Sequence, residues 1–340
     1  MNAVSSTFPA SSQATGQTPG MAGFDAEFRD LDHYIRVITD RIWEGGRIDD
    51  IGLYYSDPCI VDTPAAVSTS VQQVIDGTRA TLVMFPDRRL LAEDILQSGD
   101  DAGGYLSSHR IISTMTHRGD GVFGQASAKR VHARTIADCV CKNNRVVHEW
   151  LVRDQGAIAL QIGQQPRDLA QTWLNQRGGW NKPVAGPAPD GYRSHVDQHP
   201  VAQAYAQAIE AVARGQKLAT SVYDEAVHHI GPCETTRYGH VEVAGYWQSL
   251  FAALQVERFD IEHLVLNQGG GRPDRVALRW RAATRHTNYG AADGCFGPAS
   301  GHTVEVMGIN HAEIVDGKVL REWVLIDDVA LWMQILNVQA

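Results

Sequence analysis

The spacing of apolar and polar positions predicts helices followed by paired strands. Residues 31–45 and 200–213 place apolar side chains three and four positions apart, as in a helix with one buried face. Residues 131–154 and 304–327 instead alternate apolar and polar positions on either side of a tight turn, which indicates the two strands of a hairpin. Helices followed by hairpins are typical of an α+β fold.

This order of elements occurs twice in the chain. Residues 131–150 and 304–323 align without a gap, so that Trp323 follows Trp150 by 173 residues. Three further pairs of segments correspond: 31–62 with 200–230, 71–87 with 242–254, and 114–124 with 283–297, the last after an insertion of four residues in the second copy. Self-similarity along the whole length indicates a duplicated domain.

The repeat sets the expected domain boundaries. We predict a first domain over residues 25–163 and a second over 197–340. Residues 164–196 are rich in Pro and Gly and are predicted to be a linker with a short helix. Residues 1–24 are rich in Ser, Thr, Ala, Gly and Pro and lack the basic and apolar regions of a signal peptide, so they are predicted to be a disordered leader.

Composition and charge exclude several classes of partner. The net charge of −9 and the absence of basic runs argue against nucleic acid and against an anionic membrane surface. No apolar stretch approaches the roughly 18–20 residues of a membrane span, and a cytoplasmic location is expected. The five cysteines are scattered, and no zinc-type spacing or phosphate-binding glycine loop is present, so neither a metal nor a cofactor is predicted.

A Glu-Trp pair followed four residues later by Asp occurs in both copies. Strand alternation places His148, Trp150 and Asp154 on one face of the last strand of the first copy. A carboxylate beside a cation and an aromatic ring on a concave apolar surface suits a general base, and we predict that this face lines a cavity. The alternative is that each Asp caps the helix that follows it. The equivalent residues of the second copy are Arg321, Trp323 and Asp327.

Several segments resemble the SnoaL-like polyketide cyclases of the nuclear transport factor 2-like superfamily. The resemblance rests on the sequences FPDRRLLAEDIL at 85–96, THRGDGVFG at 116–124, and VEVMGINHAEIVDGKVLREWVLID at 304–327. It implies two cone-shaped domains, each a curved mixed or antiparallel sheet wrapped around three helices, with one deep apolar pocket. In that family an Asp and a His of the pocket carry acid/base chemistry, which is carried over by position to Asp154 and Asp327. His117 matches the family's Thr-His pair.

Histidines and other ionisable side chains near the expected pocket complete the candidate set. The first copy has more of them, whereas the last strands of the second copy match the family more closely, so either copy is a candidate for the active one. The predicted catalytic residues are Asp62, His109, His117, His148, Asp154, His286 and Asp327, and the predicted substrate-binding residues are Tyr55, His132, Arg134, Trp150, Tyr246, Arg321 and Trp323.

The expected function is that of a cofactor-independent acid/base lyase or isomerase acting on a small apolar, aromatic or polycyclic molecule. Elimination of water or formaldehyde, isomerisation and aldol-type cyclisation are all compatible with that chemistry. The competing hypothesis is a non-catalytic module for small-molecule binding or assembly. The two copies are expected to form an internal pseudo-dimer, and further homo-oligomerisation is left open.

Overall fold

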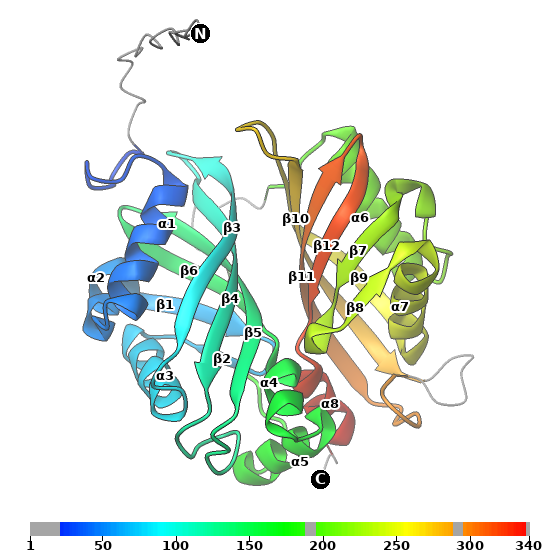
Figure 1. Cartoon of the computed structure of the whole chain (residues 1–340), viewed down its shortest axis with the longest axis horizontal. Coiled ribbons are helices and arrows are strands. Elements are labelled where there is room, and N and C mark those ends of the chain that lie inside the picture. The colour runs from blue at the N-terminus through cyan, green and yellow to red at the C-terminus, as the bar shows by residue number, and fades with distance from the viewer. Residues whose placement is uncertain (1–20, 188–194, 288–294, 338–340) are drawn as a thin grey trace, which may run out of the picture.

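The computed structural model describes residues 21–187, 195–287 and 295–337, and it contains two six-stranded mixed sheets, each with its own helices (Figure 1). The predicted α+β class and its duplication are thereby confirmed. The predicted leader lies outside the described residues as far as residue 20. No helix among the described residues is long and apolar enough to cross a membrane.

The first sheet has the strand order β2-β1-β6-β5-β4-β3, in which only the pair β1–β6 is parallel. Its strands are β1 (Tyr55–Thr63), β2 (Ala66–Ser68), β3 (Arg89–Asp100), β4 (Gly104–Thr116), β5 (Arg130–Lys142) and β6 (Arg145–Arg153). The helices of this half are α1 (Leu31–Thr39), which continues as a π-turn (Asp40–Glu44), a 3₁₀ turn (Ile48–Asp50), α2 (Ile51–Tyr54), α3 (Val71–Met84) and α4 (Gln155–Ile162).

The second sheet repeats this topology in the order β8-β7-β12-β11-β10-β9, again with one parallel pair, β7–β12. Its strands are β7 (Tyr223–Ile230), β8 (Thr236–Tyr238), β9 (Leu254–Asn267), β10 (Asp274–His286), β11 (Thr303–Val315) and β12 (Lys318–Leu325). Its helical segments are α6 (Pro200–Ala213), two 3₁₀ turns (Thr220–Val222 and Pro232–Glu234), α7 (Gly239–Ala253) and α8 (Asp328–Leu336). Between the halves, α5 spans Pro166–Arg177, where the linker was predicted to carry a short helix.

Local sequence signals explain where these elements begin and turn. Asp30 and Ser70 cap α1 and α3 by accepting hydrogen bonds from the backbone N–H groups of His33 and Gln73. The hairpin β5–β6 turns through Asn143 and Asn144, both at positive φ, which asparagine tolerates better than most residues. These signals are local, and they fix the ends of elements rather than the face that each presents.

The two sheets face each other, and their helices α1–α3 and α6–α7 lie on the two outer sides (Figure 1). Between the sheets, Ile136, Val140 and Val152 of the first half share one buried cluster with Ile309 and Leu325 of the second. At one end of the molecule, α8 packs against α4 and α5 in another apolar cluster (Figure 1). The halves therefore bury one face of each sheet against the other, as in an internal pseudo-dimer.

Candidate functional site

A cavity of about 260 Å³ lies inside the cone of the first domain, lined by residues of α1, β1, α3 and strands β3–β6. Most of its lining is apolar, including Ile38, Trp43 and Leu90. Gln73 and Gly77 of α3 also line it and are solvent-exposed. The cavity therefore reaches the surface beside α3, where a small molecule can enter.

Strand register arranges the polar lining in three adjacent rows across β4, β5 and β6. The rows are Ile111–Thr135–Arg153, His109–Ala137–Leu151, and Cys139–Glu149. Because side chains alternate along a strand, Glu149, Leu151 and Arg153 share the inner face of β6. The concave surface of the sheet thus presents Glu149 and Arg153, four residues apart on one strand.

The opposite face of β6 carries His148 and Trp150, and it packs against the second domain. The guanidinium carbon of Arg279 from β10 lies 3.7 Å from the centroid of the Trp150 ring, and the His148 ring lies 4.1 Å from the same indole. The prediction that this face lines the cavity is wrong. Both faces of β6 are buried, one by the helices and one by the other sheet, so apolar alternation alone could not identify the concave side.

The interface explains why the Glu-Trp motif occurs twice. Arg279 contacts Trp150 across the interface, and the equivalent Arg110 contacts Trp323 at 3.6 Å in the reverse direction. Each tryptophan therefore receives an arginine from the other domain, and a guanidinium over an indole face is an attractive arrangement. The two predicted substrate-binding tryptophans lie between the domains, not in the first domain's cavity.

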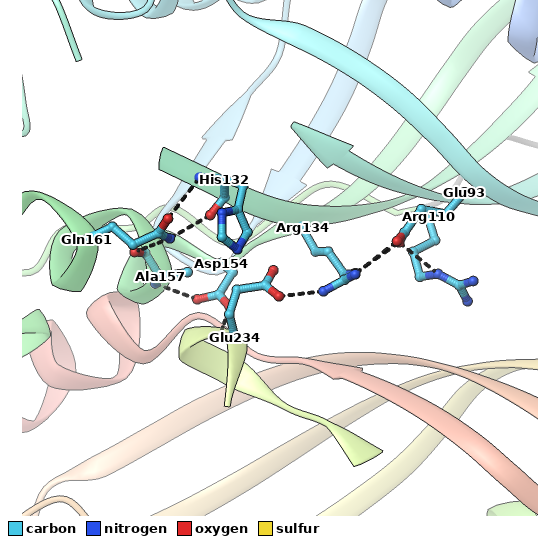
Figure 2. A network of polar contacts seen from close by, with 8 residues as sticks. All are labelled: Glu93, Arg110, His132, Arg134, Asp154, Ala157, Gln161 and Glu234. Carbon is cyan, nitrogen blue, oxygen red and sulfur yellow. Dashed lines mark hydrogen bonds and ion pairs between the residues drawn. The ribbon is translucent and has the colours of Figure 1, made fainter. Parts of the chain in front are cut away.

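Asp154 caps α4 through the contact with Ala157 drawn in Figure 2. It is not among the residues that line the cavity. Its carboxylate accepts hydrogen bonds from the backbone N–H groups of Ala157 at 2.8 Å and of Glu234 at 3.2 Å. Burial raises the pKa of Asp154 to about 8 despite these bonds. Asp154 is therefore a helix cap, as the alternative interpretation expected. Its hydrogen bond from Glu234 also connects the first domain to the turn Pro232–Glu234 of the second.

Asp327 both caps a helix and lines the cavity, the two roles that the sequence allowed. It caps α8 by accepting hydrogen bonds from the N–H groups of Val329 at 3.1 Å and Ala330 at 3.2 Å. It also belongs to the lining of the first domain's cavity. Burial raises its pKa to about 7, and the charge of Arg153 opposes that shift. The second domain therefore contributes a carboxyl group to the cavity of the first.

Glu149 is the carboxyl group that the first domain itself places in the cavity. Tyr55 of β1 donates a hydrogen bond to it at 3.2 Å. Burial raises the pKa of Glu149 to about 7, opposed by the Tyr55 hydrogen bond and by the positive charge of Arg153. A carboxyl group that titrates near neutrality can both take up and release a proton at that pH.

His109 lines the same cavity from β4. Burial, together with the charge of Arg36, lowers the pKa of His109 to about 3, so its imidazole is neutral at physiological pH. Its Nε2 atom is buried and has no hydrogen-bond partner among the described residues. A neutral imidazole with a free nitrogen can donate to an oxygen atom of a ligand when that nitrogen carries the proton.

Two arginines complete the polar lining. Arg153 ends β6, and Arg88 directly precedes β3. Burial and the nearby charge of Arg153 lower the pKa of Arg88 to about 9. Burial also lowers the pKa of Arg153, opposed by the carboxyl groups of Asp327 and Glu149. The cavity therefore holds two carboxyl groups and two guanidinium groups beside apolar walls.

Sequence reasoning missed Glu149, Arg88 and Arg153. Glu149 stands inside the repeated motif, beside the Trp that was chosen instead. The alternation of side chains along β6 could have identified Glu149 if the face of Glu149, rather than that of Trp150, had been assigned to the cavity. Arg88 carried no comparable signal, since it lies in a turn before β3, where no strand alternation applies.

Two histidines of the Thr-His motif lie outside the cavity. His117 is fully buried beside Phe85 and faces the Ser127 hydroxyl at 3.2 Å. In the second domain, His286 repeats this arrangement with Ser300 at 3.0 Å. Each ring lies at the end of the fourth strand of its domain, β4 or β10, where the following loop begins. There it holds the loop through the contact with its serine.

The remaining predicted residues are spread over the domain interface and the surface. Asp62 forms ion pairs with Lys182 of the linker at 2.8 Å and with Arg281 of the second domain at 3.1 Å. Arg134 bridges Glu93 and Glu234 across the interface (Figure 2). The other three are placed as follows: His132 is exposed, Arg321 is exposed and paired with Glu313, and Tyr246 lines a second cavity. Of the fourteen predicted residues, Tyr55, His109 and Asp327 meet in the first cavity.

The second domain keeps the buried glutamate but closes the space around it. Glu322, the equivalent of Glu149, accepts hydrogen bonds from Tyr205 at 2.7 Å and Tyr223 at 3.1 Å and contacts His229 Nδ1 at 2.6 Å. The indole of Trp280 fills the cone beside them. The second cavity, of about 510 Å³, lies between α7, the turn Pro232–Glu234 and α8, and Glu322 is not part of its lining.

Metal-binding geometry is absent from the described parts of the chain. No group of three or more His, Cys, Asp or Glu side chains is placed to hold an ion there. Carboxyl groups with raised pKa values beside apolar walls are suited to proton transfer.

Comparison with known proteins identifies the same family in both halves. The family model of the SnoaL-like polyketide cyclases matches residues 33–162 and 200–335. A SnoaL-like polyketide cyclase from Agrobacterium tumefaciens is similar in structure, with 18% identity over 39% of this chain and 98% of its own and a TM-score of 0.33. IdmH from Streptomyces antibioticus shows 16% identity over 39% of this chain and 97% of its own, with a TM-score of 0.34. TsrD from Streptomyces laurentii shows 14% identity over 41% of this chain and 98% of its own, with a TM-score of 0.35. No curated protein matches the chain in sequence.

Proposed function

The chain belongs to the SnoaL-like polyketide cyclase family, and from that premise we propose that its first domain is a lyase or isomerase that works by proton transfer. Glu149 is the general base, and the substrate is a small, largely apolar molecule with an acidic C–H bond next to a carbonyl group. The observation that supports this most directly is a buried carboxyl group with a pKa of about 7 in an apolar cavity that reaches solvent.

The neighbours of Glu149 assign the remaining roles. Tyr55 orients the carboxylate through its hydrogen bond, and burial raises the pKa of Tyr55 well above its ordinary value, so its proton stays in place. His109 donates from Nε2 to the oxygen that becomes negative as the C–H bond breaks. The ring of Trp43 forms part of the apolar wall. Proton return to another carbon gives isomerisation, attack of the enolate carbon on a carbonyl gives cyclisation, and loss of a β-substituent gives elimination.

Enolisation can be tested without the natural substrate. We expect the protein to catalyse the exchange of the C1 protons of 2-tetralone in D₂O, followed by NMR. Glu149→Gln should lower the catalysed rate by at least about 100-fold, the usual contribution of a positioned general base. The rate should rise through an apparent pKa of about 7 as the carboxyl group ionises.

Asp154→Asn is the matched control, because Asn also caps helices well and the side chain lies outside the cavity. It should leave the exchange rate within about twofold of the original protein. Exchange that survives Glu149→Gln, or that Asp154→Asn abolishes in a folded protein, would falsify the assignment of the base. A protein that binds 2-tetralone without accelerating exchange would be a binding module.

A further inference from the structure

The guanidinium groups of Arg88 and Arg153 lack the ion pairs that the arginines between the two sheets form. Arg110, Arg134, Arg279 and Arg281 each form an ion pair with at least one carboxylate within 3.2 Å. Within the described residues, the guanidinium group of neither Arg88 nor Arg153 forms a hydrogen bond or an ion pair. Both are partly shielded from solvent and line the same cavity. A shielded guanidinium without a partner is costly, because desolvation is not offset.

The carboxyl groups of the cavity act on Arg153 only from a distance and form no ion pair with either arginine. Neither Glu149 nor Asp327 lies within ion-pair distance, 4.0 Å, of either arginine in the described structure. Burial raises the pKa of both carboxyl groups to about 7, so each is partly protonated at neutral pH. The two guanidinium groups therefore leave an excess of positive charge on the cavity wall, in a chain whose net charge is −9.

Evidence for a role specific to this cavity comes from the second domain. Ile326 occupies the position of Arg153 there, directly before the capping Asp327. The fold and the interface between the sheets therefore do not require a cation at this position. In the first domain, Gln155 also lines the cavity, and its buried side-chain oxygen lacks a hydrogen-bond partner. That oxygen can accept a hydrogen bond but cannot bind an anion, so the donors that the cavity offers to an anionic ligand here are the two guanidinium groups.

We propose that Arg88 and Arg153 bind a carboxylate carried by the substrate, which makes the substrate an aromatic or polycyclic carboxylic acid. This inference rests on the proposed function for the position of the reacting carbon. Arginine binds carboxylates through paired, charge-assisted hydrogen bonds, and two arginines can hold both oxygens. Arg153 and Glu149 are four residues apart on β6, so their Cα atoms are separated by about 13 Å at ~3.3 Å per residue. The carboxylate-binding group and the proposed base therefore project from different positions along β6.

The test compares 2-naphthoate with 2-naphthamide, two probes of the same shape that differ in charge. Binding is measured by isothermal titration calorimetry on the full chain at neutral pH. We expect 2-naphthoate to bind at least about tenfold more tightly than the amide, because only the acid gains charge-assisted hydrogen bonds. Arg153→Met and Arg88→Met should each remove most of this preference.

Arg89→Met is the matched control, since Arg89 is adjacent in sequence but exposed, and it pairs with Glu44 outside the cavity. It should keep the full preference for the acid. Arg153→Met and Arg88→Met should also unfold at an equal or higher temperature than the original protein without ligand, because each removes a partly shielded charge that no ion pair offsets. Lower melting temperatures for both would show that the arginines serve the fold and would overturn the proposal.

The outcomes separate this proposal from the proposed function. Equal binding of naphthoate and naphthamide would refute the carboxylate site, even if exchange of 2-tetralone is catalysed. A preference for naphthoate that depends on Arg88 and Arg153 would support the site, even if the protein catalyses no exchange. Glu149→Gln should keep the preference for the acid, since it removes the base and leaves both arginines in place.

Discussion

The two domains share one topology and one buried Tyr–Glu pair, yet only the first leaves its glutamate facing a cavity. Tyr55 donates to Glu149 in the first domain, and Tyr223 donates to Glu322 in the second. Glu149 lines a cavity with few other partners, whereas Glu322 has its hydrogen-bonding capacity filled by Tyr205, Tyr223 and His229. The same residue at the same place in the fold is thus available to a ligand in one copy and fully used by the protein in the other.

A small number of substitutions account for this difference. Strand register places Trp280 where the first domain has Ile111, and Gly308 where it has Thr135. A Cβ atom at Gly308 would lie 2.2 Å from the Trp280 indole, so the large ring depends on the glycine opposite it. The indole donates to Asn310, whose amide in turn donates to Tyr205. The space that is a cavity in the first domain is therefore occupied by a ring and a hydrogen-bond chain.

The two copies share their packing and their interface contacts, but only the first leaves an open cavity around its glutamate among the described residues. The reciprocal contacts of Arg110 with Trp323 and of Arg279 with Trp150 need both copies. The cavity lies within the first copy, and Asp327 is the residue of the second copy in its lining. The second domain therefore covers one face of the first sheet and supplies one residue to the lining of its cavity.

Removal of the Trp280 ring, which fills the second cone, should cause the largest loss of stability. Trp280→Ala should lower the free energy of unfolding by about 3–5 kcal/mol, because it leaves a cavity in a close-packed core. The equivalent Ile111→Ala should cost only about 1–2 kcal/mol, since Ile111 already borders empty space. Urea denaturation followed by circular dichroism measures both. Equal losses would show that the two cones are packed alike.

The buried glutamates should respond in opposite ways to the same substitution. Glu322→Gln should cost about 3 kcal/mol, because Gln replaces an acceptor oxygen by an NH₂ donor that faces hydroxyl and imidazole groups already donating to that site. Glu149→Gln should change the free energy of unfolding by less than about 1 kcal/mol at neutral pH, since it removes a desolvated carboxyl group with one hydrogen bond. The measurement is urea denaturation at about pH 7. A large loss in Glu149→Gln would contradict the view that Glu149 is held at the expense of stability.

The difference between the two glutamates should also appear as a dependence of stability on pH. The pKa of Glu149 is raised from 4.5 to about 7 in the folded protein, so the folded state holds a proton that the unfolded chain has lost. Its contribution to stability is full below about pH 4.5 and disappears as the pH rises through about 7. Relative to Glu149→Gln, the original protein should therefore lose on the order of 2 kcal/mol between about pH 5 and pH 8. Parallel pH profiles for the two proteins would show that Glu149 ionises normally.

Much of the fold could be predicted from the sequence, because its signals are local or repeated. The alternation at 131–154 and 304–327 predicts the hairpins, and the gap-free alignment of the Trp150 and Trp323 segments predicts the duplication. Capping was also a local signal, since an Asp directly before an apolar helical segment favours the N-terminus of a helix. Both aspartates do cap helices, as the alternative interpretation expected.

The residues of the cavity were predicted only in part, and strand alternation shows why. It separates His148 and Trp150 from Glu149 and Arg153, but both sets are buried, one against the other sheet and one around the cavity. An apolar and a polar face can be distinguished in sequence because they differ in residue type. Two buried faces of one strand can be told apart only by what covers each of them.

By itself, the sequence determined that this chain folds as two related α+β domains and which residues end their helices and strands. Those properties follow from side-chain periodicity and from hydrogen bonds between near neighbours in the chain. The tertiary structure alone decided that Glu149 faces a cavity with Arg88, Arg153 and Asp327 while Glu322 is enclosed. Burial, charge proximity and empty space are set by residues far apart in sequence, and the curvature of a sheet brings them together.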